Sequence, residues 1–500
     1  MQIASSRIFT STALATVFCA QSAFADVSAS DVWENWQSYM SSYGYEISAS
    51  EAQSGDTLTI SDLVMNIQMP EEAGKIDMEW GTLTFVENGD GTVTISLPAS
   101  QPMVFRSDSP AEKVSATMDV ATDLTMVASG DKDALKYTHT ADALKIAVTE
   151  LVVNDEKIEN VDIAMAVAGM SGESELLVGE LTKSRGTSTI ETTDITVKGT
   201  DPESGAAFDF AATLSGLKAD VDSAFPEGAY SADPMAFFAP GMMLVGGYTF
   251  DGMTVAGNFE EDGAPGSVAV ESGGGSFNID MSDSKMAYDG RLGNMTINVA
   301  GADIPVPIDV SFGEFGYGFS LPIAAAEAAQ DFAFNLTLAD LEISELLWGM
   351  FDPAQVLPRD PATLVVDLVG KGTVLQDLMT LDETTDEMPG ELNALTIRDL
   401  RLNAAGASVE GSGDFVFDNT DLESFDGLPR PEGAIDIKID GVNGLMDKLI
   451  QMGLLPEEQA MGARMMMSMF TQPGEGDDSL TSKIEVNEQG HVLANGQRLK

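Results

Sequence analysis

The 500-residue chain contains one cysteine, Cys19, and two histidines, His139 and His491. An internal disulfide is therefore excluded, and a zinc site with the usual cysteine and histidine ligands is disfavoured. No G-x-S-x-G nucleophile elbow occurs to pair with a histidine, so a Ser-His-Asp triad is not expected. The glycine clusters at 273–275 and 313–318 match neither the dinucleotide-binding nor the phosphate-binding motif. We therefore name no catalytic residue and expect no cofactor.

Basic residues are scarce: 25 Lys and Arg stand against 80 Asp and Glu, for a formal charge of −55. Such a chain repels nucleic acid and anionic membranes, so we expect no nucleic-acid partner. Hydrophobic residues still make up 44% of the chain, which argues against disorder. The acidity is best explained by a solvated surface whose self-repulsion is screened by salt.

Long hydrophobic runs are missing too, and the first 25 residues have the pattern of a secretory signal peptide. Arg7 supplies the positive region, Ile8 to Phe18 a short apolar region, and residues 23–25 (Ala-Phe-Ala) a cleavage site. We expect cleavage after Ala25, a soluble periplasmic product and no integral membrane anchor. A lipid anchor on Cys19 is disfavoured because the bulky Phe18 precedes it.

Alternation of apolar and polar residues dominates the rest of the chain and predicts short antiparallel strands. Hairpin turns are predicted at 88–91 and 487–490, and Pro305 and Pro307 predict that their strand lies at an edge. The fold class is mostly β, with a long curved antiparallel sheet or two packed sheets and a few covering helices. The alternating runs are 93–97, 114–120, 161–167, 208–214, 304–312, 332–338 and 435–439.

Helices are predicted at four places, where apolar residues recur at helical spacing. The segments are 32–43, 338–350, 445–452 and 456–470, and the last two form a helical hairpin. The Pro- and Gly-containing stretch 225–247, with a short helix at 232–239, divides the mature chain. We expect a β-rich N-terminal half at 26–230 and a β-rich C-terminal half at 245–500, within one architecture.

Two kinds of binding residue are suggested by the sequence. Met461, Met465 and Met469 stand four apart on one helix face, and with Phe470 and Trp348 they are candidates to line an apolar ligand groove. Packing of the helix, or thioether binding of Cu(I), would use the same methionines. The acidic turns at 88–92 and 260–263 lack the full spacing of a calcium loop, so ordinary turns are favoured over a metal site.

Several motifs resemble those of an uncharacterised family of exported alphaproteobacterial proteins. They are 346–353 (LLWGMFDP), 357–363 (LPRDPAT), 439–442 (IDGV) and 492–497 (VLANGQ). The resemblance implies export and a β-rich fold, and it supplies no catalytic residue. The strand-rich body with its Asn495-Gly496 ending is distantly similar to AsmA-type envelope proteins, whose curved sheets are associated with lipid handling. This chain differs from those proteins, because they have an N-terminal membrane anchor and we expect none here.

These observations favour a non-enzymatic periplasmic protein that binds an apolar ligand or lipid in envelope maintenance. One alternative is a hydrolase acting through carboxylates, with calcium as a possible aid. Another is an envelope scaffold without a ligand. A continuous Met, Phe and Leu lining would favour the first, and converging acids with raised pKa values would favour the second.

Overall fold

A computed structural model describes residues 27–69, 74–201, 204–226, 238–261, 263–381 and 389–500. The predicted signal peptide, and all but the last two residues of the short helix predicted at 232–239, lie outside these residues. Within them the chain forms one antiparallel sheet of 28 strands with four α-helices. The predicted mostly β class, with a long antiparallel sheet, is confirmed.

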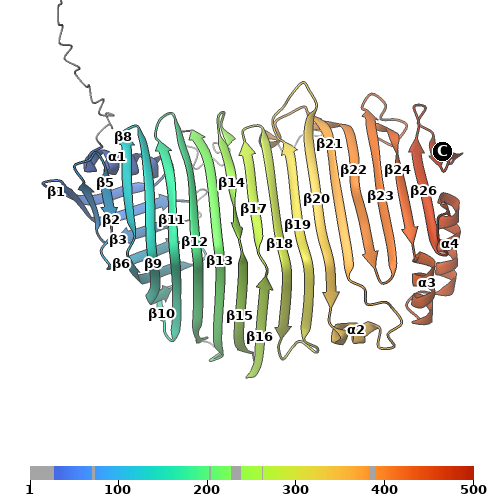
Figure 1. The fold of residues 1–500 in the computed structure, drawn as a ribbon, viewed down its shortest axis with the longest axis horizontal. Coiled ribbons are helices and arrows are strands. Elements are labelled where there is room, and N and C mark those ends of the chain that lie inside the picture. The colour runs from blue at the N-terminus through green and yellow to red at the C-terminus, as the bar shows by residue number, and fades with distance from the viewer. Residues whose placement is uncertain (1–26, 70–73, 202–203, 227–237, 262, 382–388) are drawn as a thin grey trace, which may run out of the picture.

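The sheet is elongated, and its strands follow one another roughly in chain order from one end to the other (Figure 1). The N-terminal strands are β1 (Glu46–Ser54), β2 (Thr57–Gln68), β3 (Lys75–Trp80), β4 (Leu83–Glu87), β5 (Val93–Ser96), β6 (Ser100–Asp108), β7 (Lys113–Thr122), β8 (Thr125–Asp131), β9 (Ala134–Val153) and β10 (Glu156–Ile158). The central strands are β11 (Val161–Leu177), β12 (Leu181–Thr200), β13 (Ala207–Pro226), β14 (Met243–Phe250), β15 (Gly252–Glu261), β16 (Ala264–Ser272), β17 (Gly275–Ser282), β18 (Lys285–Ala300), β19 (Ile308–Pro322) and β20 (Gln330–Ile343). The C-terminal strands are β21 (Ala362–Val374), β22 (Gly390–Ala404), β23 (Ala407–Asp418), β24 (Arg430–Asp440), β25 (Gln472–Pro473), β26 (Ser479–Val486), β27 (Val492–Ala494) and β28 (Gln497–Arg498).

Several of these elements are halves of one interrupted strand. β3 and β4 both pair with β2, and β14 and β15 both pair with β13. β7 and β8 both pair with β9, and β16 and β17 both pair with β18. β5 and β6 pair with the halves β4 and β3 on one side and with β8 and β7 on the other. The sheet is thus a long meander that runs without a gap from β13 to β14 and β15, so the two predicted halves share one sheet.

The interruptions line up across neighbouring strands, and we call this line the crease. It consists of strand breaks and of residues with left-handed backbone dihedrals. Its breaks are at 81–82, 97–99, 123–124, 251 and 273–274, and its left-handed residues are Asp62, Gly169, Gly216, Asn294 and Asp340. A left-handed residue inside a strand changes which face the following side chains occupy.

Phe312 and Phe315 show this change directly. They lie on either side of the crease in β19, and their ring centroids are 6.3 Å apart. Residues three apart in a regular strand point to opposite faces of the sheet, so contact between these rings requires the local irregularity. The apolar side chains consequently stay on one face of the sheet across the crease.

The core of the N-terminal end is built around α1 (Ala29–Ser42). Ser28 caps this helix, because the backbone N–H of Asp31 donates to its hydroxyl over 3.1 Å. Trp33 is fully buried against Phe85 of β4, and its indole N–H donates to Glu51 over 2.7 Å. α1 therefore covers the apolar face of the sheet at this end.

The C-terminal end holds the predicted helical hairpin, formed by α3 (Val442–Gln451) and α4 (Glu457–Phe470). The helix predicted at 338–350 is wrong in its first part, since residues up to Ile343 belong to β20 and the helix α2 is only Glu345–Phe351. The predicted edge strand at 304–312 is also wrong. β19 begins after Pro307, because proline lacks the N–H that a ladder needs, and it pairs with β18 and β20 on its two sides.

Candidate functional site

One face of the sheet carries apolar side chains on nearly every strand, and we call it the apolar face. Its centre is a row of aromatic rings on the adjacent strands β14, β17, β18 and β19. Tyr248 lies 5.7 Å from Phe277, Phe277 lies 6.0 Å from Tyr288, and Tyr288 lies 5.3 Å from Phe319, all between ring centroids. Such distances are those of favourable aromatic pairs. Four neighbouring strands thus share one continuous aromatic surface.

The strand register extends this surface toward the C-terminal end. Phe319 is the cross-strand partner of Phe334, which is the partner of Leu368, which in turn faces Ile397. Direct cross-strand partners lie on the same face of a sheet. The same relation continues through β23 to Ile435 of β24. The apolar face is therefore continuous as far as the strands beside the helical hairpin.

Much of this surface is only partly covered. Among the described residues, buried apolar side chains gather at the N-terminal end, under α1, and in a small cluster around Met242 and Phe225. Water contact of large apolar groups costs about 25 cal/mol per Å². The large apolar side chains of this face that remain 36–49% exposed are Ile195, Val221, Tyr248, Ile308, Tyr317, Leu321, Phe334 and Leu402.

A cavity of about 300 Å³ lies at the α1 end of the apolar face. Its lining is almost entirely apolar and aromatic, and it comes from α1, β8, β9, β11 and β12. This volume is at the lower limit of small-molecule sites. The residues that line it are Trp36, Tyr39, Met40, Met126, Tyr137, Ser174, Leu176 and Ser184.

Tyr137 supplies the polar group best placed beside this cavity. Burial raises the pKa of its phenol, so the hydroxyl stays neutral at physiological pH. The hydroxyl lies 3.3 Å from the side-chain oxygen of Asn35, which is itself buried. The cavity thus offers apolar contact and a few neutral hydroxyls, including that of Tyr137, and no charged group lines it, a set suited to an apolar guest and not to an ion.

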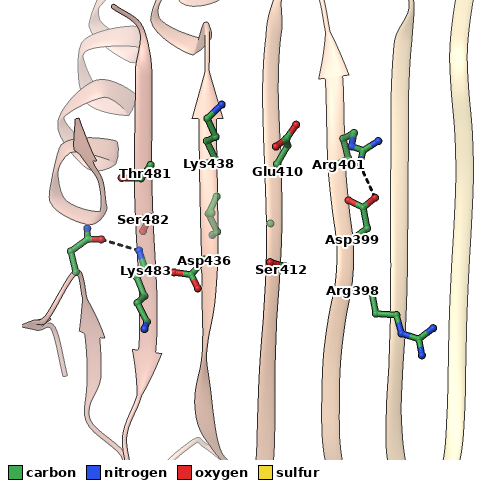
Figure 2. Close-up of a pocket in the computed structure, with 13 residues that line it drawn as sticks. Arg398, Asp399, Arg401, Glu410, Ser412, Asp436, Lys438, Thr481, Ser482 and Lys483 are labelled. Carbon is green, nitrogen blue, oxygen red and sulfur yellow. Dashed lines mark hydrogen bonds and ion pairs between the residues drawn. The ribbon is translucent and has the colours of Figure 1, made fainter. Parts of the chain in front are cut away.

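The opposite face of the sheet is polar and carries a hollow of about 610 Å³ across β22, β23, β24 and β26 (Figure 2). Its charges alternate from strand to strand: Glu410 stands between Arg401 and Lys438, and Asp436 stands opposite Lys483. These charges offset one another across the strands. The hollow therefore has the character of a solvated charged surface.

Two ion pairs at this hollow support that description. Arg401 lies 2.9 Å from Asp399, and Lys438 lies 2.6 Å from Asp440. The hydrogen bond between Lys438 and Asp440 raises the pKa of the lysine and lowers the pKa of the carboxyl. Both partners are thus held in their charged forms, as in an ordinary surface pair.

A carboxylate-dependent hydrolase would need an acid whose pKa is raised toward neutrality. Among the described residues, each carboxyl whose pKa departs from its ordinary value has it lowered, through hydrogen bonds and basic neighbours. These carboxyls are Asp90, Glu175, Asp352, Asp418, Asp421, Asp440 and Asp478. The described part of the chain also contains no group of three or more His, Cys, Asp or Glu side chains placed to hold a metal ion.

In the acidic turn at 88–92, the carboxylate of Asp90 accepts hydrogen bonds from within the turn. Asp90 accepts hydrogen bonds from the backbone N–H of Thr92 over 3.1 Å and from its hydroxyl over 2.6 Å. These bonds lower the pKa of Asp90. The turn connects β4 and β5, as predicted for a hairpin.

The predicted groove residues do not come together. Met461, Met465 and Met469 are 63–69% exposed on the outer side of α4, while Phe470 is half-buried where that helix ends. Trp348 is on α2, which strands β21 to β24 separate from α4 (Figure 1). The Arg359 guanidinium lies 4.2 Å above the Trp348 ring, which also contacts Phe351. The methionines therefore point to solvent, and the Trp348 ring packs against Phe351 and Arg359 of its own segment.

The aromatic row is the part of the site that the sequence analysis missed. Its signal was present as aromatic residues at every second position, at Phe315, Tyr317 and Phe319 and again at Phe332 and Phe334. This spacing predicts one face of a strand. Which strands lie side by side, and hence which rings meet, depends on the register of the sheet.

Comparison with known protein families gives a match to the C-terminal part of the chain. A family model described as "Uncharacterized protein conserved in bacteria (DUF2125)" matches residues 295–496, from within β18 to β27. The predicted resemblance to an uncharacterised bacterial family is confirmed over this stretch, and the similarity to AsmA-type proteins stays a prediction. No curated protein and no solved structure matches the chain. In the described residues, none of the helices has the length and apolar character needed to span a membrane.

Proposed function

We propose that this protein is exported to the periplasm and, without being an enzyme, binds lipid acyl chains along the apolar face in the maintenance of the envelope. The observation that supports this most is the part-exposed apolar surface that runs continuously from β12 to β22. Soluble proteins rarely leave a surface of this kind open unless it meets a partner.

The chemistry of the face favours an acyl chain over a polar ligand. In β19 the residues on this face are Ile308, Val310, Phe312, Phe315, Tyr317, Phe319 and Leu321. Their partners in β18 and β20 are likewise uncharged. A ligand held here gains burial of apolar area and finds no ionic partner on the face. The scarcity of Lys and Arg further favours neutral or zwitterionic lipids over anionic ones.

A fluorescent fatty-acyl probe tests the proposal. We expect saturable binding to the purified protein and displacement by neutral lipid. Phe334→Asp should weaken probe binding about tenfold or more, because a charge replaces a ring at the centre of the face. Phe334 is 44% exposed, so the variant should fold.

Asn335→Asp is the matched control, because it adds the same charge one residue further on, where the side chain points to the polar face. Its probe affinity should equal that of the wild type. Absence of saturable probe binding, or equal weakening by both variants, would contradict the proposal.

A further inference from the structure

The outer surface of α4 is uncharged over its last two and a half turns. Met461, Met465, Met466 and Met469 are 63–69% exposed there. The other exposed residues between 461 and 469 are glycine, alanine and serine. In a chain of net charge −55, an exposed helix face with four large apolar side chains and no acid is a marked local departure.

The only charged residue in this segment, Arg464, is turned away from that surface. Its guanidinium donates to Asp447 of α3 over 2.7 Å and to the carbonyl of Asn443 over 3.1 Å. At the end of the helix, the carbonyl of Phe470 accepts a hydrogen bond of 2.6 Å from Ser482 of β26. α4 is thus fixed to α3 and to the sheet, with its methionines held outward.

We infer that this methionine surface docks on a lipid bilayer, with the four side chains inserted at the level of the headgroups. An amphipathic helix with a large apolar face lies in the plane of a membrane in this way. The hairpin is at the C-terminal end of the sheet (Figure 1), so docking brings that end of the apolar face to the membrane. The inference rests on the proposed function, and it specifies the ligand of the apolar face as a lipid of the bilayer.

Charge favours a bilayer over a second copy of the chain as the occupant. Two copies that meet through α4 would bring two strongly acidic bodies together, and their repulsion opposes association. A zwitterionic bilayer has no net charge. The acidic remainder of the protein is repelled by anionic lipids, so the uncharged face of α4 is the part that can approach a membrane closely.

Flotation with phosphatidylcholine vesicles tests the inference on the full mature chain. The wild-type protein should float with the vesicles. Met465→Ser combined with Met466→Ser should reduce the bound fraction about tenfold, since both side chains are exposed and their removal does not disturb the core. Leu346→Ser combined with Met350→Ser is the matched control on α2, where these side chains are 58% and 61% exposed. This control should float like the wild type.

The acyl-probe assay in solution separates this inference from the proposed function. The α4 variant should bind the probe with unchanged affinity while it loses flotation. Flotation equal to that of the wild type, or an equal loss in the α2 control, would overturn the docking surface. A wild-type dimer that becomes a monomer in the α4 variant, measured by sedimentation equilibrium, would overturn it in favour of a contact between copies. Intact flotation without probe binding would refute the proposed function alone.

Discussion

Asp352 is the one charged residue among the fully buried side chains of the described chain, with 1% of its surface exposed. It accepts hydrogen bonds of 2.9 Å from the backbone N–H groups of Val356 and Leu357, and one of 2.7 Å from Arg359. Burial acts to raise the pKa of Asp352, but these hydrogen bonds outweigh burial and lower it. The carboxylate thus organises the loop that follows α2.

Replacement of this carboxylate should destabilise the protein in a pH-dependent way. We expect Asp352→Asn to lower the unfolding temperature by several degrees at pH 7, because an amide cannot accept from three donors or pair with Arg359. A lowered pKa in the folded state means that the contribution of Asp352 is fully present above its unfolded pKa of about 4 and is lost as pH falls through the folded value.

The difference in unfolding temperature between wild type and Asp352→Asn should therefore shrink below pH 4. Calorimetric scans from pH 7 to pH 3 measure it. A difference that is constant over this range would show that the charge of Asp352 has no role.

The sequence indicates which residues share one face of a helix, but it does not indicate what that face meets in the fold. The methionines at 461, 465 and 469 were correctly placed on one helix face, yet the sequence could not say whether that face met the sheet or water. This is decided by how α4 is fixed through Arg464 and Phe470 to distant elements. The contact of Arg359 with the Trp348 ring likewise depends on the fold of this segment and cannot be read from the sequence.

At the scale of elements, the crease explains both a success and a failure of sequence reading. The seven alternating runs fall on β5, β7, β11, β13, β19, β20 and β24, because one face of each of these strands is apolar. In β20, however, the left-handed Asp340 separates Leu338 from Leu341, so two residues of one face stand three apart. That spacing imitates a helix, and it is why the segment 338–350 was predicted as helical. A crease depends on neighbouring strands and cannot be read from a single one.

A substitution at Gly216 tests whether the crease requires glycine at this position. Its φ is +64°, and a Cβ added there would collide with the carboxylate of Asp251, which lies in the break between β14 and β15. We expect Gly216→Ala to cost about 2 kcal/mol or more in the free energy of unfolding, from backbone strain and from displacement of Asp251. Urea denaturation followed by tryptophan fluorescence measures the change.

Gly55→Ala is the control for backbone strain alone. Gly55 has a φ of +61° in the turn between β1 and β2, and nothing lies within 4 Å of an added Cβ. Its cost should be about 1 kcal/mol. Equal costs for the two variants would show that the contact with Asp251 does not constrain the crease.

For the whole molecule, the large negative charge sets the response to salt. The Debye length falls from about 30 Å at 0.01 M to about 3 Å at 1 M ionic strength, so added salt screens repulsion among the excess carboxylates. We expect the unfolding temperature to rise by several degrees over this range of sodium chloride. An unfolding temperature that does not change with salt would contradict this account of the acidic surface.

The same charge distribution links the two proposals for the whole molecule. Acids cover the polar face, where they pair with the few basic residues, whereas the apolar face in β18 to β20 and the outer surface of the last two and a half turns of α4 lack charge. The length of the sheet and the open apolar face follow from the meander, which in the described part of the chain adds strands without a second layer over the centre. A protein so built has an apolar surface that is available to a ligand along the centre of its length.

Whether the apolar face binds acyl chains can be measured by native mass spectrometry of the protein, purified without detergent from its own envelope. We expect a mature chain that begins at Asp26 and carries added mass in steps of one lipid molecule, and we expect Phe334→Asp to lose this added mass. A bare chain with no adduct, even after incubation with neutral lipid, would contradict the claim that the apolar face binds acyl chains.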